Sequence, residues 1–467
     1  MNVNLLDVNH AAARTHALLT ALDKAARDRF AGEAQQEASR RGLMRGPDEI
    51  PLVLSPVALP REDLRLLGHA ARLLVSALVK VSRDLVASRP QRARLLFAHL
   101  SPLELAALEG RSLEGEELLV ARVDWFIDRQ AGRVRALEVN STIPAMQIYS
   151  DAAVAGWLHA FLPESRAAAL VATSPSNAGW LLDTFLGAAQ AAGRGDPSRP
   201  FPQGLEVQLL HRNGDPQITE LQGLVTLLTA RGAGARTVTP DDINLDGDPR
   251  RAIYRHLFAR HVEKESALGR AFLEPNRHGM WNRVNGWLET KGLVAELSLH
   301  VDRAGARSAL LTDEELACVR DVLPWTRILD DATDAELGDG DLIVLKRSHD
   351  YGGKSVVIGR EVGPTAFKTA LASARAEPPG TWVAQGLVDA PASDRWLAVR
   401  AKDGTRSATQ LPLHLDISTY ASLLPNAREG GSVCRAAPGR IVNIVGGGGV
   451  APLFTEEVLA EALAARS

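Results

Sequence analysis

The chain is poor in cysteine and has no excess of positive charge. Only two of its 467 residues are cysteines, Cys318 and Cys434, too few for a disulfide framework or a cysteine-rich metal cluster. The formal net charge is −3, so the chain lacks the basic excess on which nucleic-acid binding usually depends. With 45% hydrophobic and 23% charged residues, the composition is that of a soluble globular protein.

Signals for secretion and membrane insertion are also lacking. The first apolar residues are interrupted by Asp7, His10 and Arg14, which differs from a signal peptide. The most apolar long stretch, Leu64–Val81, contains four basic side chains and predicts an amphipathic helix, not a membrane span. We therefore expect a cytoplasmic protein with neither a membrane nor a nucleic-acid partner.

The pattern of the sequence changes along the chain. The first part shows helical spacing, and a predicted hairpin and helix follow it. A stretch of alternating strands and helices then indicates an α/β layer with largely parallel pairing. The last part is richer in strands and glycine. We expect an α/β (α+β) chain with units at residues 1–118, 119–165, 166–290 and 291–467.

Several elements are predicted individually. Thr312–Val322 begins with a Thr cap and has Glu315 three residues later, a capping box that starts a helix. Ala168–Ala172 resembles a short strand, and Trp281–Thr290 a helix. Arg440–Val445 is a further strand candidate.

The hairpin is the first candidate site. Two apolar runs, Val123–Ile127 and Val134–Val139, flank a polar turn that contains Gly132, which is typical of a β-hairpin. Folding the chain about residues 130–131 brings Asp124 opposite Glu138 to within one residue.

By the same folding Arg122 comes opposite Asn140. Side chains two residues apart on a strand share a face, so Arg122, Asp124, Glu138 and Asn140 lie on one surface. Their oxygen atoms suit Mg²⁺ held together with substrate phosphates. A solvated hairpin with a salt bridge fits the same residues, so the hairpin alone leaves both interpretations open.

A second motif follows the predicted strand Leu342–Lys346. Gly352 and Gly353 lie in a polar loop that leads into another strand, and glycine lets backbone amides approach phosphate oxygens. Lys346 adds a point charge for a phosphate. The loop is not a Walker A motif, because position 348 is serine and no helix follows. An ordinary glycine hairpin is the alternative.

Two weaker signals complete the set. The apolar strand Thr381–Leu387 runs into a connector that can offer backbone groups to an adenine edge, with Asp389 near a ribose; a buried strand with polar ends is the alternative. Lys291 stands at the change from the α/β stretch to the strand-rich stretch, where a solvated lysine is the simpler expectation. For His349 we expect a solvated loop residue.

In this order the motifs resemble the ATP-grasp superfamily. They are more similar to its circularly permuted branch, as in the synthetase domain of glutathionylspermidine synthase. In ordinary members the acidic residue and the Glu-x-Asn pair follow the glycine-rich loop, whereas here Asp124 and Glu138-Val-Asn140 precede Lys346. The resemblance covers residues 119–467 and requires the hairpin to pack against the Lys346 loop.

The resemblance implies a circularly permuted ATP-grasp fold with a helical N-terminal region. It implies an ADP-forming carbon–nitrogen ligase that uses ATP and Mg²⁺ to join a small-molecule or peptide carboxylate to an amine through an acyl phosphate. The implied roles are metal binding by Asp124, Glu138 and Asn140, nucleotide binding by Lys291, Lys346, Tyr351, Gly352, Gly353, Gln385, Leu387 and Asp389, and catalysis by Arg122.

Alternatives stay open at this point. An ATP-dependent phosphotransferase and a non-catalytic nucleotide-binding partner protein would use the same motifs, and a homo-oligomer is compatible with either. Arg435 and Asn443 face phosphates or an acceptor, or belong to a strand pair followed by the loop Gly446–Gly449. We expect Asp416 to lie in a turn, and a polar contact in the site is the alternative. Residues 1–118 match no part of the family, and Ser141–Ala145 differs from its acidic continuation.

Overall fold

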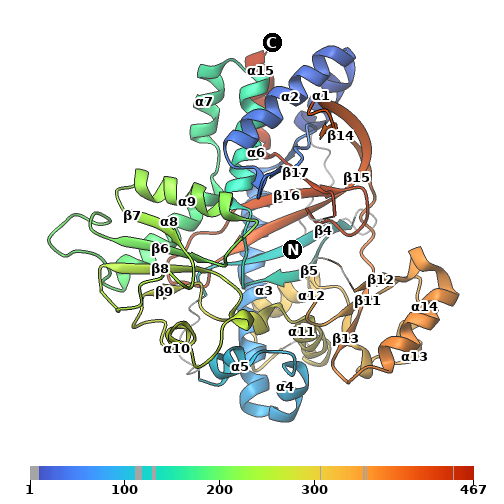
Figure 1. Ribbon diagram of the computed structural model, residues 1–467. Coiled ribbons are helices and arrows are strands. Elements are labelled where there is room, and N and C mark those ends of the chain that lie inside the picture. The colour runs from blue at the N-terminus through green and yellow to red at the C-terminus, as the bar shows by residue number, and fades with distance from the viewer. Residues whose placement is uncertain are drawn as a thin grey trace.

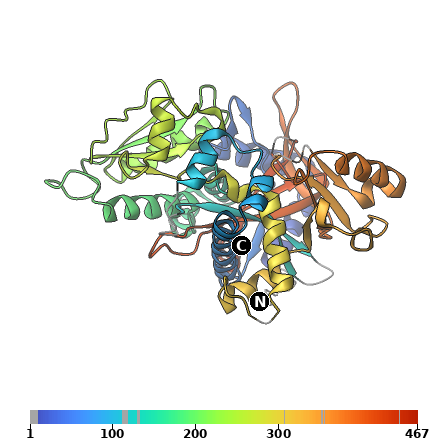
Figure 2. The same ribbon diagram turned by 90° about the horizontal axis from the view of Figure 1, so that it is seen from below.

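The computed structural model describes residues 10–110, 118–128, 133–305, 307–350, 353, 355–444 and 446–466. Three sheets organise this mixed α/β fold. Figures 1 and 2 show a central antiparallel sheet with a parallel sheet (green) on one side and a smaller antiparallel sheet (orange) on the other.

The central sheet joins the predicted hairpin to strands from the C-terminal part of the chain. Its strand order is β17 (Gly449–Ala451), β16 (Ser432–Ala437), β15 (Arg406–Ala421), β4 (Ala121–Asp128) and β5 (Arg133–Asn140), and β14 (Ser393–Arg400) also pairs with β15. The β4–β5 register confirms the predicted hairpin, since Arg122 pairs with Asn140 and Asp124 with Glu138. A bulge between Asp124 and Trp125 shifts the register of the outer half.

The second sheet is wholly parallel, as the alternation of strands and helices predicts. Its order is β7 (Gly234–Val238), β6 (Glu206–His211), β8 (Arg251–His256) and β9 (Met280–Trp281). Its helices are α8 (Asn177–Ala191), α9 (Ile218–Ala230) and α10 (Ala267–Leu273). Because β6 lies between β7 and β8, the strand order reverses there.

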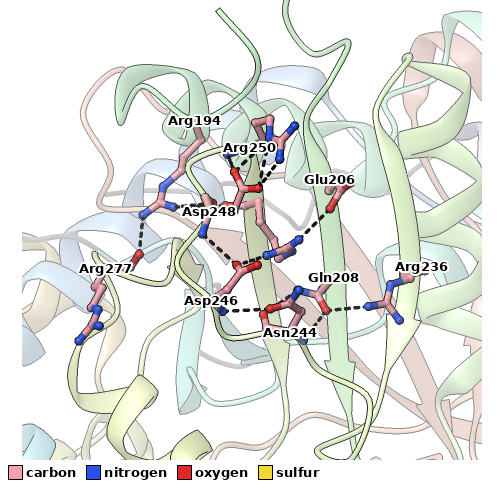
Figure 3. Close-up of polar contacts among 10 residues, drawn as sticks. Arg194, Glu206, Gln208, Arg236, Asn244, Asp246, Asp248, Arg250 and Arg277 are labelled. Carbon is pink, nitrogen blue, oxygen red and sulfur yellow. Dashed lines mark hydrogen bonds and ion pairs between the residues drawn. The ribbon is translucent and has the colours of Figure 1, made fainter.

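Charged side chains fasten the loop beside the amino ends of these strands (Figure 3). Arg251 contacts Glu206 at 3.1 Å and also Asp246, while Arg250 contacts Asp248 at 2.6 Å. Each pair has one partner that is at least half exposed to solvent, which weakens its contribution to stability. We regard this cluster as structural.

The third sheet has the order β10 (Thr326–Ile328), β13 (Trp382–Gly386), β11 (Ile343–Arg347) and β12 (Val356–Ile358), all antiparallel. Its helices are α13 (Asp334–Leu337) and α14 (Gly359–Arg375). Leu345, Phe367 and Ala384 form part of a separate small core between this sheet and its helices. The strand that carries Lys346 is therefore supported by a unit with its own core.

The remaining elements enclose the central sheet. The long helix α3 (Arg61–Ser88) packs against β15, α11 and α12 and belongs to the same apolar core as the hairpin. The other helices are α1 (His10–Ala21), α2 (Lys24–Arg40), α4 (Pro90–Leu96), α5 (Pro102–Glu109), α6 (Gln147–Phe161), α7 (Glu164–Thr173), α11 (Lys291–Arg303), α12 (Asp313–Val322) and α15 (Glu456–Arg466). Short elements are β1 (Met44–Arg45), β2 (Asp48–Glu49), β3 (Val57–Leu59), β18 (Leu453–Thr455), η1 (Ala259–His261), η2 (Gly286–Glu289) and η3 (Leu329–Asp331).

Among the described residues, the structure contains no helix long and apolar enough to span a bilayer.

Some elements differ from expectation. Ala168–Ala172 lies inside α7 and is not a strand, because its alanines favour a helix that packs on α6. Trp281–Thr290 contains the end of β9, a loop and η2 in place of the predicted helix, since its asparagines and glycine favour turns. Residues 440–444 form no strand. The capping box at Thr312 is present.

One close contact fixes α6 on α2. A Cβ on Gly156 would come within 2.6 Å of the Ala38 Cβ, 2.7 Å of its amide nitrogen and 2.8 Å of the Ala34 carbonyl oxygen. Two of these atoms are backbone and cannot rotate away. Gly187, inside α8, has no neighbour within 4 Å of the same position.

We therefore expect opposite effects from one substitution at two helix glycines. Gly156→Ala gains about 1 kcal/mol of helix propensity. The new methyl group forces α2 and α6 apart, and we expect this to outweigh the gain by about 1–3 kcal/mol and to lower the melting temperature. Gly187→Ala should raise it slightly. Thermal unfolding followed by circular dichroism measures both; equal shifts would contradict the close packing.

Candidate active site

The hairpin and the Lys346 strand line the same cavity, of about 340 Å³, although they lie far apart in the sequence. Their proximity is what the resemblance required. The predicted residues that line it are Arg122, Asp124, Glu138, Asn140, Lys291, Lys346, Gly353, Gln385 and Leu387. Asp416, Arg435 and Asn443, whose roles the sequence left open, line it as well.

Strand register explains why so many polar groups meet on one wall. Arg122 of β4 pairs with Asn140 of β5 on one side and with Tyr420 of β15 on the other. One row along, Asp124 pairs with Glu138 and Ser418. Because residues two apart share a face, these side chains form a polar ladder across the central sheet.

Asp124 is at the centre of this ladder and is fully buried. Arg122 donates Nε to Asp124 Oδ1 at 2.8 Å and Nη2 to Oδ2 at 3.1 Å, and Asn140 Nδ2 donates to Oδ2 at 3.1 Å. Arg435 Nη2 donates to Oδ2 at 2.8 Å. Burial alone would raise the pKa of Asp124, but the charges of Arg122 and Arg435 outweigh it and hold the pKa well below its usual range.

Arg435 connects Asp124 to a second buried carboxylate. It pairs across β15 and β16 with Asp416, donating Nε to Asp416 Oδ1 at 3.0 Å. Burial raises the pKa of Asp416 to about 6, against the attraction of Arg435. The expected turn at Asp416 is wrong, because this residue lies within β15. A lone Asp and a lone Arg in separate strands carry no spacing signal that would have shown their pairing.

The part of the cavity wall formed by β11, β13 and the start of α11 carries two lysines. Lys346 Nζ donates to Gln385 Oε1 at 2.7 Å, so the two adjacent strands β11 and β13 hold it in place. Lys291 Nζ lies 3.5 Å from Glu138 Oε2. Burial lowers the pKa of Lys346 to about 8, and the positive charge of Lys291 adds to this while Glu138 opposes it. A polyanion is the complement of this wall.

Two buried glutamates hold the segment after the hairpin. Glu289 accepts the backbone N–H of Ser141 at 2.6 Å and also that of Thr142. Glu220 of α9 accepts the amides of Met146 at 3.0 Å and Ile148 at 3.2 Å, at the start of α6. The segment from Ile143 to Met146, which lines the cavity, is therefore fixed by side chains of the parallel-sheet region.

The oxygen donors on the hairpin are of the kind that Mg²⁺ prefers. Glu138, whose side chain is 36% exposed, and Asn140 both line the cavity, which suits an ion that takes few protein ligands and the rest from phosphates and water. Asp124 Oδ2 already accepts three hydrogen bonds, so a cation would reach this carboxylate through Oδ1 or after one donor leaves. Within the described residues, no three His, Cys, Asp or Glu side chains cluster as a metal site.

Among the predicted nucleotide residues that the structure describes, Asp389 does not line the cavity. Asp389 pairs with Arg440 at 3.3 Å and Arg360 at 3.7 Å. Arg440 itself lines the cavity, so Asp389 contacts the lining through this arginine. Tyr351 and Gly352 lie outside the described residues.

Comparisons with known proteins support the fold. No family model and no curated protein matches the sequence. A glutathione synthetase-like effector from Globodera pallida superposes with a TM-score of 0.56 over 93% of this chain and 98% of its own, at 11% identity. A putative γ-glutamylcysteine synthetase from Methylobacillus flagellatus covers 84% and 94% at 11% identity, with a TM-score of only 0.34. The first shows that the chain shares the effector's overall fold; the second is too distant to support an argument.

Glu220 gives the cavity wall a pH dependence. Burial raises the pKa of Glu220 to about 7, although the amides of α6 oppose the shift. Between the usual value of 4.5 and about 7 the folded chain keeps a proton that the unfolded chain loses, so the free energy of unfolding falls as pH rises through that window.

Glu220→Gln keeps the shape and removes the charge. We expect the difference in melting temperature, Glu220→Gln minus wild type, to be more positive at pH 8 than at pH 5 by about 2 °C or more. The exposed Glu62→Gln on α3 is the matched control and should show a smaller pH effect. A Glu220→Gln difference that does not change with pH would contradict the buried charge.

Proposed function

We propose that this protein is an ADP-forming, ATP-dependent ligase that joins a carboxylate to an amine. One observation carries the proposal: a single cavity is lined by carboxylate and amide oxygens of the hairpin and by two lysines from β11 and α11. Phosphoryl transfer from ATP needs this combination, because it depends on positioning and charge neutralisation more than on covalent help.

We also propose that the fold is a circularly permuted ATP-grasp fold, similar to the synthetase domain of glutathionylspermidine synthase. Support comes from the order of the motifs, since the hairpin precedes Lys346 in the sequence while both line the cavity. The similarity to a glutathione synthetase-like effector supports a ligase-type fold without identifying a substrate. The division into units at 1–118, 119–165, 166–290 and 291–467 belongs to this proposal.

In the proposed reaction a carboxylate oxygen attacks the γ-phosphorus of ATP, and the bond from that phosphorus to the β–γ bridging oxygen breaks, so ADP leaves with the electron pair. The amine nitrogen then attacks the acyl carbon. Phosphate leaves, the nitrogen loses a proton, and an amide remains. The substrates are a small-molecule or peptide carboxylate and an amine acceptor.

The chain's residues divide the work by charge. Lys291 and Lys346 bind phosphate oxygens, and Gln385 orients Lys346 through its hydrogen bond. Arg122, held by Asp124 and the Ala145 carbonyl oxygen, faces the reacting groups. Glu138 and Asn140, with Asp124, would hold Mg²⁺, which neutralises phosphate charge when bound. The two buried free thiols, Cys318 and Cys434, fit a cytoplasmic protein.

The first test is ADP release over a panel of amino acids, peptides and polyamines, with hydroxylamine present. Hydroxylamine traps an acyl phosphate as a hydroxamate, which defines the reaction class. Glu138→Gln and Asp124→Asn should lower ADP release by about two orders of magnitude or more, and Glu62→Gln should not. Near-normal turnover in both variants would refute the metal assignment, and a stable phosphorylated product without any amine would indicate a phosphotransferase.

A second test uses the lowered pKa of Lys346. Below about pH 8 this lysine is charged and binds phosphate; above it the neutral form does not. We expect the dissociation constant of ADP to change little between pH 7 and 8 and to rise by up to about tenfold per pH unit above pH 8. Lys346→Arg remains charged and should lack that rise, as isothermal titration calorimetry can measure. An equal rise in this variant would assign the effect to another group.

A further inference from the structure

The glycine-containing loop that follows β11 starts at Ser348, and this residue is held firmly by its neighbours. Ser348 is fully buried, its N–H donates to the Thr381 carbonyl oxygen at 2.8 Å, and its own carbonyl oxygen accepts the N–H of Lys291 at 2.8 Å. Ser348 Oγ accepts the N–H of Gly292 at 2.9 Å. Thr290 makes no side-chain cap bond, so Ser348 caps the first turn of α11 from another part of the chain.

Asp350 extends this contact toward the cavity. Its carbonyl oxygen accepts Lys291 Nζ at 2.8 Å, and its carboxylate accepts the hydroxyl of Ser355. The same ammonium group lies 3.5 Å from Glu138. Asp350 and Glu138 therefore hold the Lys291 ammonium group between the start of the loop and the hairpin.

The N-terminal helical region supplies the other side of this contact. His99, between α4 and α5, stacks on His349 with ring centroids 4.7 Å apart and planes 16° apart. His99 Nε2 lies 3.3 Å from Thr290 Oγ1, beside the start of α11. One imidazole thus touches both the loop and the residue that precedes Lys291.

Two glycines let α4 approach the base of the loop closely. A Cβ on Gly292 would come within 2.8 Å of Leu96 Cδ2 and 3.0 Å of Ser348 Oγ. A Cβ on Gly380, one residue before Thr381, would come within 2.4 Å of Leu95 Cδ2. Leu96 therefore packs on Gly292, a partner of Ser348, and Leu95 on Gly380, which precedes its other partner Thr381.

We propose that His99 is a positioning residue for nucleotide binding: it clamps His349 against the start of α11 so that Lys346 and Lys291 converge on one phosphate chain. The role goes to a side chain from residues 1–118, the region for which the sequence offered no function. This inference rests on the proposed ATP-dependent activity, because it assigns the loop to the nucleotide.

Charge makes the clamp sensitive to acid. His99 faces His349, Arg260 and Lys291, and His349 faces Asp350, Arg347, Lys291 and Arg260. Burial and these cations lower the pKa of His99 to about 4 and also lower that of His349, where Asp350 opposes the shift. The folded chain binds fewer protons here than a free loop would, so docking weakens as pH falls below 6.5.

The experiment compares His99→Ala and His99→Phe with His69→Ala, a change at a partly exposed histidine on α3. Hydrogen exchange of peptides covering residues 346–358 reports on loop docking without any need for turnover. Calorimetry with Mg·ADP reports on nucleotide affinity. Comparing each variant with His69→Ala at the same pH removes the intrinsic pH dependence of exchange.

We expect His99→Ala to speed exchange in these peptides and to weaken Mg·ADP binding by about threefold to tenfold, the range expected for one aromatic stack. His99→Phe keeps a ring without a titrating group, so its exchange rate and its affinity for Mg·ADP should equal those of the wild type at pH 7. Between pH 7 and 5 its affinity should fall less than that of the wild type.

Unchanged exchange in His99→Ala would overturn the clamp, and so would faster exchange with unchanged affinity. A failure of His99→Phe to restore either readout would overturn stacking as the cause. If wild-type protein binds no Mg·ADP, the proposed function fails, and the exchange data alone then decide whether His99 holds the loop.

Discussion

Neutralisation of buried charge across the central sheet is the constraint on which the rest of the site depends. Asp124 and Asp416 are both buried, and Arg435 lies between them as the shared counter-ion. Removing one partner of such a group leaves an uncompensated charge, at a cost of about 3–5 kcal/mol. The ladder therefore ties β4, β15 and β16 into one register, and that register sets where Glu138 and Asn140 face the cavity.

The hairpin and its register could be predicted from the sequence because they depend on local patterning. The apolar runs and a glycine-containing turn placed Asp124 opposite Glu138 to within one residue, and the bulge at Asp124/Trp125 sets the exact pairing. Likewise Thr312 and Glu315 form a capping box that a three-residue spacing already indicates. The Lys346 strand was predictable for the same reason.

Features that depend on distant partners could not be predicted. Nothing near Asp416 in the sequence shows that Arg435 neutralises it, and nothing near His99 shows that it stacks on His349. Asp389 was expected beside a ribose, yet arginines at 360 and 440 form ion pairs with it. The prediction of a strand at Ala168–Ala172 was wrong for a different reason, because a short apolar run does not distinguish a strand from a helix.

The place of β4 in the central sheet has a consequence for how the protein is made. This strand pairs with β15, so the hairpin can join the central sheet only after the ribosome has synthesised β15, and it must wait for that. At ordinary rates of synthesis that wait is roughly 15 to 60 seconds. Until then β4 has one open edge, and Asp124 lacks Arg435 as its second counter-ion. A truncated chain that lacks β15 and β16 would keep the residues of the hairpin but would lack Ser418, Asp416 and Arg435, which complete the polar ladder.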